Sequence, residues 1–275
     1  MATALITGGT SGIGAAFARQ LAASGHDLVL VARDRERLKS AAERLHADSG
    51  INVEILRADL ANRADVARVA GRLEDPERPI DLLVNNAGLG VHTRLTSPEV
   101  AVHDHAFEVM CRAVLVLGGA AGRAMAVRQT GAILNVSSLQ SLLVTGSYAA
   151  MKAWVTSYSE SLSVELRGTG VTVTVLMPGW VATEWHERAG VRTSSIPGWL
   201  WTDPELVART ALRDVARGRV VSVPTLRYKV FGWVGRHLPR GVIRSISSAL
   251  SSRRRAADSP IELKRKSESK VGTKL

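Results

Sequence analysis

Tyr148 and Lys152 are the two side chains in this sequence whose types and spacing point most directly to chemistry. In a helix, positions four apart lie on one face about one turn apart, so the phenol and the ammonium can project into one site. An ammonium held that close favours the phenolate, so we expect the pKa of Tyr148 to fall from about 10 toward neutrality. The pair therefore predicts a tyrosine that gives or takes a proton.

A glycine-rich turn near the N-terminus supplies a second candidate site. Gly8, Gly12 and Gly14 follow a predicted strand and open a predicted helix, which is the context that a dinucleotide-binding turn requires. Glycines let the backbone approach a pyrophosphate closely, and the helix N-terminus faces its charge. The alternative is a flexible loop that happens to be rich in glycine. With the tyrosine–lysine pair downstream, the turn indicates a redox enzyme.

Strands and helices alternate along the chain, which predicts a parallel sheet covered by helices on both faces. Apolar, β-branched runs predict strands over 2–7, 27–32, 51–57, 80–85, 131–136, 171–177 and 219–223. Helical patterns lie near 12–24, 34–48, 62–74, 98–128, 147–168 and 203–217. Two of these helices have clear start signals, because Asn62 is a good cap and Asp203 precedes Pro204.

Five motifs, in order and at compatible spacings, resemble those of the classical short-chain dehydrogenase/reductases. They are Thr7-Gly8-x-x-x-Gly12-Ile13-Gly14, Asn85-Asn86-Ala87-Gly88, Asn135-Val136-Ser137-Ser138, Tyr148-x-x-x-Lys152, and Pro178-Gly179 with Thr183. The resemblance covers roughly residues 1–225 and looks most like actinobacterial ketoacyl-reductase-like members. It implies a single-domain α/β Rossmann fold with a doubly wound, seven-stranded parallel sheet, and assembly into homodimers or homotetramers.

The resemblance also assigns roles to individual residues. It implies that Tyr148 transfers the proton, that Lys152 lowers its pKa and holds the nicotinamide ribose, and that Ser138 hydrogen-bonds the substrate oxygen. Asp59 matches the position that binds the adenine amine, although it could instead cap the 62–74 helix. The full set of cofactor positions that the resemblance implies is Gly8, Thr10, Ser11, Gly12, Ile13, Gly14, Arg33, Asp59, Leu60, Asn85, Ala87, Gly88, Tyr148, Lys152, Pro178, Gly179, Val181 and Thr183.

The end of the second strand bears on cofactor choice. An NAD enzyme needs a carboxylate there for the ribose hydroxyls, whereas a 2′-phosphate needs a guanidinium. Ala32 stands at the place of the acid and Arg33 follows it, so the sequence favours NADP(H) over NAD(H). Against this, Ser11 occupies a position where many NADP members carry a second basic residue. Arg33 could also be a solvated cation at a helix start.

Two departures from the family pattern bear on the catalytic residues. Only ten positions separate Ser138 from Tyr148, which makes the substrate loop 139–147 short, and Ser137 or Ser141 could replace Ser138. A gapless alignment also places Met110 where the family carries a catalytic asparagine on its long central helix. Methionine cannot supply the amide that anchors a water-linked proton relay.

Composition narrows the function further. The longest apolar run, roughly 113–122, is far shorter than the ~20 residues that span a bilayer, and no signal peptide is visible, so we expect a cytoplasmic protein. The single Cys111 excludes an internal disulfide and reads as a small core residue. His103 and His105 are two positions apart, so on a helix their side chains point away from each other and do not form a metal-binding pair. We expect them on a solvated helix face.

The positive charge is concentrated at the C-terminus. Residues 227–275 hold 13 lysines and arginines against 3 acidic residues, so the body of the chain is nearly neutral and a nucleic-acid partner is not expected. The stretch 226–250 is basic and amphipathic, and Pro239 splits it into two short helices. It fits either peripheral contact with an anionic membrane or packing on the domain or a partner subunit. Residues 251–275 have the composition of a disordered basic tail.

The leading hypothesis is an NADP(H)-dependent enzyme that interconverts a carbonyl and a secondary alcohol on an apolar substrate, such as an acyl chain or another lipid. Trp180, Trp185, Trp199 and Trp201 are expected to line or cap the substrate pocket, or to pack within the fold. One alternative is a steroid or lipid-alcohol dehydrogenase that uses NAD(P)+. Another is a dinucleotide-binding redox sensor without turnover, which intact Ser138, Tyr148 and Lys152 argue against.

Overall fold

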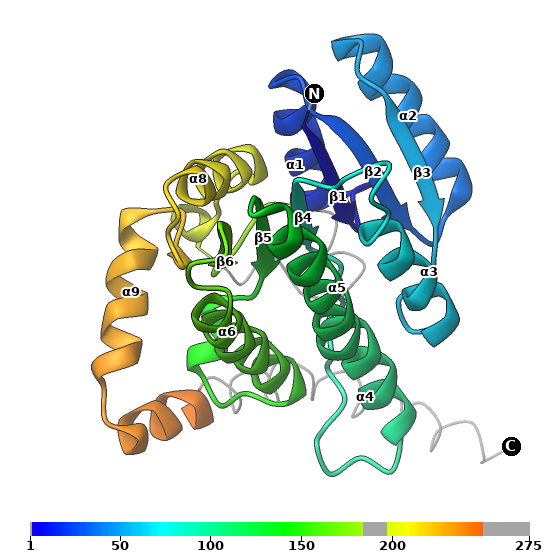
Figure 1. The fold of residues 1–275 in the computed structure, drawn as a ribbon. Coiled ribbons are helices and arrows are strands. Elements are labelled where there is room, and N and C mark those ends of the chain that lie inside the picture. The colour runs from blue at the N-terminus through cyan, green and yellow to red at the C-terminus, as the bar shows by residue number, and fades with distance from the viewer. Residues whose placement is uncertain (1, 184–196, 250–275) are drawn as a thin grey trace, which may run out of the picture.

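A seven-stranded parallel sheet forms the centre of the protein in the computed structural model, which describes residues 2–183 and 197–249 (Figure 1). The strand order is β3-β2-β1-β4-β5-β6-β7, so the chain runs outward in one direction from β1 to β3 and in the other from β4 to β7. Strands buried on both faces need continuous apolar runs, which these segments have. Their bounds are β1 Thr3–Thr7, β2 Asp27–Ala32, β3 Val53–Arg57, β4 Leu82–Asn85, β5 Gly131–Val136, β6 Val171–Leu176 and β7 Val221–Ser222.

Helices cover both faces of the sheet and form two separate apolar cores with it. One core holds side chains of α1 (Gly12–Ala23), α2 (Arg35–Ser49) and α8 (Pro204–Ala216). The other holds side chains of α3 (Arg63–Leu73), α5 (Ala113–Arg128) and α6 (Ser147–Glu165). The doubly wound Rossmann-like fold expected from the sequence is therefore confirmed.

Polar caps explain where the helices begin. The Asn62 side chain accepts hydrogen bonds from the N–H groups of Ala64 and Asp65, so it caps α3 as expected. Asp203 accepts from Glu205 N and is followed by Pro204 in the first turn of α8. Each cap satisfies backbone donors that the first helical turn leaves unpaired.

The expected helix over 98–128 contains a wide turn. It consists of α4 (Val100–Phe107), a π-helical segment (Glu108–Arg112) and α5, and the N–H of Ala113 reaches back to the carbonyl of Glu108. The span Val100–Arg128 is long and apolar enough to cross a membrane, with a mean hydropathy of 1.4 in its most apolar window. Because 61% of that window is buried inside the fold, we interpret it as a core helix.

The C-terminal part of the described chain lies along the edge of the molecule beside α6 (Figure 1). Helix α9 (Leu226–His237) ends just before Pro239, and a second helix covers 240–249, so the expected split at this proline is confirmed. The expected tail over 251–275 and Trp185 lie outside the described residues.

Candidate active site

The candidate site residues gather at the carboxyl ends of the strands, where the strand order reverses between β1 and β4. Open α/β sheets bind ligands in the crevice at this switch point. The glycine turn follows β1, the segment 85–88 follows β4, Ser138 follows β5 and the segment 178–183 follows β6. The topology thus collects motifs that are far apart in the sequence.

The glycine turn is tightly built. Gly8 and Gly12 have positive φ values of 67° and 54°, which side-chain-bearing residues rarely adopt. At Gly14, a Cβ would lie 2.2 Å from the Gly8 carbonyl oxygen, so only glycine fits. The Asn86 amide donates to the carbonyls of Thr7 (3.0 Å) and Gly8 (3.3 Å), which fastens the turn to the end of β4. The turn is therefore a fixed scaffold, and the flexible-loop alternative does not describe it.

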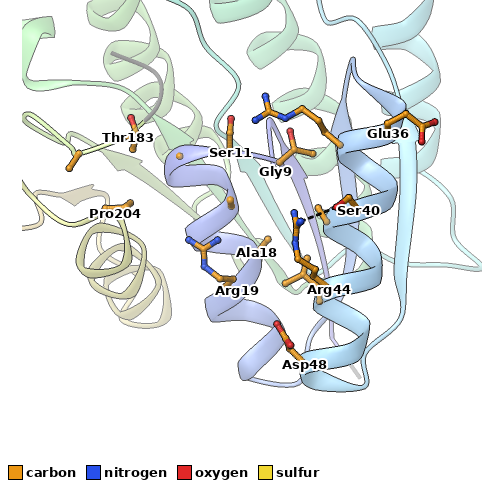
Figure 2. A pocket seen from close by; sticks show the side chains of 17 residues that line it. Gly9, Ser11, Ala18, Arg19, Glu36, Ser40, Arg44, Asp48, Thr183 and Pro204 are labelled. Atoms are coloured by element: carbon orange, nitrogen blue, oxygen red, sulfur yellow. Dashed lines mark hydrogen bonds between the residues drawn. The ribbon is translucent and has the colours of Figure 1, made fainter. Parts of the chain in front are cut away.

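The remaining predicted residues of the turn lie around this scaffold. Thr10 and Ser11 line a groove of about 790 Å³ that starts at the turn and continues between α1 and α2 (Figure 2). Ile13 is partly buried against the core beneath α1. Thr183 lies over the turn, because a Cβ on Gly12 would come within 3.3 Å of its side chain.

Three arginines lie near the end of β2. Arg33 is exposed, and its carbonyl oxygen accepts a hydrogen bond of 3.1 Å from Nε of Arg57, at the end of β3. Arg37, on the first turn of α2, lines the same groove as Ser11. Sequence reasoning identified only Arg33, because the pairing of β2 with β3 brings Arg57 to this edge and the start of α2 brings Arg37 to the groove. Three guanidinium groups suit a bound phosphate.

The residues after β3 and β4 have different surroundings. Asp59 accepts from Ala61 N (3.0 Å), and α3 is capped by Asn62, so the alternative of Asp59 as the cap of that helix is wrong. Leu60 is buried in the core. The Asn85 amide is buried and donates to Asn135 Oδ1 (2.9 Å), which directs its side chain into the sheet.

Tyr148, Lys152 and Ser138 converge as the sequence predicts. Helix α6 starts after Gly146, whose φ of 101° favours glycine, and this places Tyr148 in the first turn and Lys152 one turn later. The Tyr148 hydroxyl is hydrogen-bonded to the Ser138 side chain, and Ser138 Oγ also accepts from Gln140 N (3.1 Å). The hydroxyl groups of Tyr148 and Ser138 are therefore neighbours in the site.

Lys152 reaches across from α6 to the end of β5. Its Nζ donates to the Val136 carbonyl oxygen (2.7 Å) and lies 5.8 Å from the centre of the Tyr148 ring. A hypothetical Cβ on Gly88 would lie 3.7 Å from this ammonium, so the backbone at Gly88 forms one wall beside it. Ala87 packs against the core next to it.

The expected fall in the pKa of Tyr148 is wrong for this structure. Burial raises the pKa of Tyr148 to about 12, and the hydrogen bond from Ser138 lowers it only in part. Burial also lowers the pKa of Lys152 to about 8. The physical reason is that both groups lose water, which disfavours the charged form of each, while the ammonium points at the Val136 carbonyl. Tyr148 is therefore a neutral phenol at pH 7.

Ser137 and Ser141, the two alternatives to Ser138, differ in their hydrogen bonds. Ser137 Oγ donates to the Lys152 carbonyl (2.7 Å) and is also hydrogen-bonded to Thr156 Oγ1 (2.8 Å), so it fastens α6 to β5. The buried Oγ of Ser141 makes no hydrogen bond within the described part of the chain. Of the three serines, Ser138 is hydrogen-bonded to Tyr148.

Met110 lies in the π-helical turn and is fully buried. Its sulfur would be 3.7 Å from a Cβ on Gly88, the same distance as Lys152 Nζ, so the side chain faces the site beside the ammonium. This is the place that the gapless alignment gave it. π-helical turns inside α-helices occur frequently at functional sites. The next residue, Cys111, is buried in the core as expected.

Met110→Asn should lower the stability of the protein by about 1–3 kcal/mol, because a buried amide would lack partners for most of its donors and acceptors. Thermal unfolding with and without NADPH measures this. Met110→Leu keeps the site apolar at similar volume and should stay within about 1.5 kcal/mol of wild type. A variant with asparagine that is as stable as wild type would show that the position has polar partners.

The segment after β6 packs against α9. Pro178 accepts from Leu139 N (3.0 Å) through its carbonyl, and a Cβ on Gly179 would lie 2.0 Å from the Tyr228 ring, so the ring covers this glycine. Val181 is buried and pairs with Thr202. Among the tryptophans, the rings of Trp180 and Trp201 lie 6.0 Å apart, whereas Trp199 is 60% exposed.

His103 is not on a solvated helix face, contrary to expectation. Its Nδ1 is hydrogen-bonded to Ser147 Oγ (2.7 Å) and its Nε2 lies 3.1 Å from the Arg94 carbonyl. The histidine therefore ties α4 and the preceding loop to the start of α6, next to Tyr148. The described residues contain no cluster of histidine, cysteine and acidic side chains that could hold a metal.

Comparison with known proteins agrees with this geometry. Residues 2–192 match the family described as short chain dehydrogenase. An uncharacterised oxidoreductase of Staphylococcus saprophyticus is 34% identical over 66% of this chain and 78% of its own length. A protein named as ketoacyl reductase 1 of the granaticin polyketide synthase of Streptomyces violaceoruber is 32% identical over 79% of this chain and 80% of its own.

Solved structures give the same result. A short-chain dehydrogenase from Sphingobium yanoikuyae in complex with NADPH superposes with a TM-score of 0.78 at 34% identity, over 84% of this chain and 91% of its own. A bulky-bulky ketone specific alcohol dehydrogenase from Comamonas testosteroni has a TM-score of 0.73 at 29% identity, over 94% of both chains. The chain therefore belongs to the short-chain dehydrogenase/reductase family, oxidoreductases that bind a nicotinamide dinucleotide and interconvert carbonyl and alcohol groups.

Proposed function

We propose that this enzyme is an NADP(H)-dependent reductase that converts a bulky, apolar ketone into a secondary alcohol. The observation that carries the proposal is the meeting of the Tyr148 hydroxyl with Ser138, beside the buried Lys152 ammonium. The neutral phenol holds the proton that a developing alkoxide needs, and an alkoxide is basic enough to take it even though burial raises the pKa of Tyr148 to about 12. This favours the reductive direction.

Each residue of the site has a distinct task in this reaction. A bound nicotinamide would supply the hydride for the carbonyl carbon. Ser138 donates a hydrogen bond to the substrate oxygen and orients it toward Tyr148, which protonates the developing alkoxide. Lys152 holds a positive charge next to the ring and offers its remaining donors to the ribose. The proton leaves Tyr148 as the C–O double bond becomes a single bond.

The surroundings of the site support an apolar substrate. The short helix Leu139–Leu142 directly follows Ser138, and Val144 beyond it is exposed. The paired rings of Trp180 and Trp201 lie on the segment after β6. The relative from Comamonas testosteroni is specific for bulky ketones, and the relative from Streptomyces violaceoruber is named for ketoacyl reduction, which fits an acyl chain or similar group.

Purified protein mixed with NADPH tests this function directly. We expect NADPH oxidation with ketones that carry two large apolar substituents, and slower oxidation with small polar ketones. A protein that binds NADPH but oxidises it with none of them would favour the redox-sensor alternative.

NADP(H) is proposed as the cofactor on the basis of the guanidinium groups near β2. Arg33→Ala should weaken NADPH binding by about 1.5–3 kcal/mol and leave NADH binding nearly unchanged, because NADPH alone carries the 2′-phosphate. Arg57→Ala should have the same selectivity with a smaller effect, since its Nε is already bonded to the Arg33 carbonyl. Titration of both dinucleotides measures this. Arg209→Ala, on the exposed side of α8, is the matched control, and equal losses for both dinucleotides would make Arg33 a structural cation.

A homo-oligomer and a cytoplasmic location belong to the same proposal. Phe107, Leu115 and Val164 are each about half exposed or more, on α4, α5 and α6, and such apolar side chains support contact between subunits through these helices. Sedimentation velocity of the purified protein tests the assembly.

A further inference from the structure

Helix α9 presents an apolar stripe to solvent. At about 100° per residue, Leu226, Val230, Trp233 and Val234 fall on one side of the helix, and we call these four residues the α9 stripe. Their exposed fractions lie between 38% and 77%, and that of the large Trp233 side chain is 64%. The opposite side, with Tyr228 and Gly232, is buried against the domain. The packing expected for this segment thus accounts for one face of α9 and leaves the other uncovered.

Basic side chains border the stripe. Lys229 and Arg236 lie on one flank of α9 and Arg227 on the other, and the helix over 240–249 adds Arg240 and Arg244. Residues 226–249 contain no aspartate or glutamate. Arg227 and Arg236 also hydrogen-bond within the fold, to Thr202 and Glu160. An exposed tryptophan among aliphatic residues, bordered by cations, is the pattern of a helix that lies in the interface of an anionic bilayer.

The buried side of the same two helices holds the loop after Ser138. A Cβ on Gly232 would lie 3.4 Å from the Leu139 side chain, and a Cβ on Gly235 would lie 3.1 Å from Leu142. The backbone N–H of Val144 donates to Ser247 Oγ (3.1 Å) in the helix over 240–249. The α9 stripe therefore lies on the outer side of helix α9, and the loop that follows Ser138 packs on the inner side of the same helix.

A second copy of the chain is a poorer occupant for the stripe. In a twofold dimer, the same patch of each subunit meets itself. The five cations of each copy would then gather at one interface, to which residues 226–249 of the second copy bring no acidic side chain, so repulsion between like charges opposes such an interface. An anionic lipid surface satisfies both the cations and the apolar side chains.

We propose that α9 and the helix over 240–249 dock on the anionic surface of a lipid bilayer, with the α9 stripe inserted among the headgroups. The docked enzyme then holds the loop after Ser138 on the inner side of α9, about one helix thickness from the membrane surface, which brings the active site near amphiphilic ketones in the bilayer. Docking is a property of this surface alone, and it stands whether or not the proposed reduction is correct.

Vesicle sedimentation with the full chain tests the docking. We expect binding to phosphatidylcholine vesicles that contain phosphatidylglycerol, little binding to phosphatidylcholine alone, and release as salt rises, because salt screens the attraction. Val230→Ser with Trp233→Ser should weaken binding at least about tenfold, since the protein loses two apolar side chains that insert into the membrane. Lys229→Glu with Arg244→Glu should weaken it at least about 25-fold.

Matched variants elsewhere serve as controls. Val127→Ser removes an apolar side chain that is 85% exposed on α5, and Arg209→Glu with Arg213→Glu makes the same charge change on α8. Both should bind vesicles like wild type, and all variants should keep wild-type turnover of a water-soluble ketone. Equal losses in stripe and control variants, or no binding by wild type, would overturn the proposal. Stripe variants that dissociate an oligomer but still bind vesicles would assign the stripe to a subunit interface instead.

Discussion

Replacing Tyr148 by phenylalanine should lower kcat for ketone reduction by a factor of about 10² to 10⁴, which is the usual contribution of a positioned general acid. The ring stays in place and only the hydroxyl bonded to Ser138 is lost, so the protein should still bind NADPH. Steady-state reduction and a separate NADPH titration distinguish the two effects.

Tyr158→Phe is the matched control for this experiment. It makes the same change on the same helix, where the hydroxyl donates to the Leu115 carbonyl (3.3 Å) on α5. Turnover in this variant should stay near wild type, with at most a small loss of stability. If Tyr148→Phe also keeps wild-type turnover, the proton must come from another donor and the proposed mechanism fails.

Replacing Gly14 by alanine should abolish NADPH binding and lower the melting temperature. The new Cβ would lie 2.2 Å from the Gly8 carbonyl oxygen and 2.5 Å from the Asn86 amide nitrogen, so the turn would have to open. Both neighbours are held by the hydrogen bonds that fasten the turn to β4. Dinucleotide titration and thermal unfolding measure the two losses.

Gly71→Ala provides the comparison for this substitution. Gly71 lies near the end of α3, where an added Cβ meets no atom within 4 Å. Alanine is the better helix former by roughly 0.5–1 kcal/mol, so this variant should be slightly more stable and should bind NADPH normally. A Gly14→Ala protein that behaves in the same way would mean that the turn does not fix the cofactor.

Much of the fold could be predicted because its signals are local. The buried parallel strands are continuous apolar runs, and the starts of α3 and α8 follow from Asn62 and Asp203. The order of the motifs likewise placed Tyr148, Lys152 and Ser138 at one site. Met110 was placed beside them by counting residues back from β5.

The remaining features depend on three-dimensional surroundings. The pKa of Tyr148 follows burial and the direction of the Lys152 ammonium, and spacing alone contains neither. Arg57 reaches the cofactor edge only because β2 and β3 pair in a particular register. His103 contacts Ser147 from a helix 44 residues earlier in the chain. No residue pattern in Glu108–Arg112 signals a π-helical turn.

The π-helical turn lets the long helix hold one residue more than a regular helix with the same orientation at both ends. The hydrogen bond of this turn runs from the Ala113 N–H to the Glu108 carbonyl, five residues back, whereas an α-helical bond spans four residues. Removing one residue between Glu108 and Arg112 would therefore restore a regular helix and leave α4 and α5 in nearly the same relative orientation. His103 would then still face Ser147, and the change would fall on the side chains of the turn itself, among them Met110 beside Gly88. When segments are exchanged between this enzyme and its relatives, a one-residue deletion here would therefore change which side chain stands beside Lys152 and leave both ends of the long helix in place.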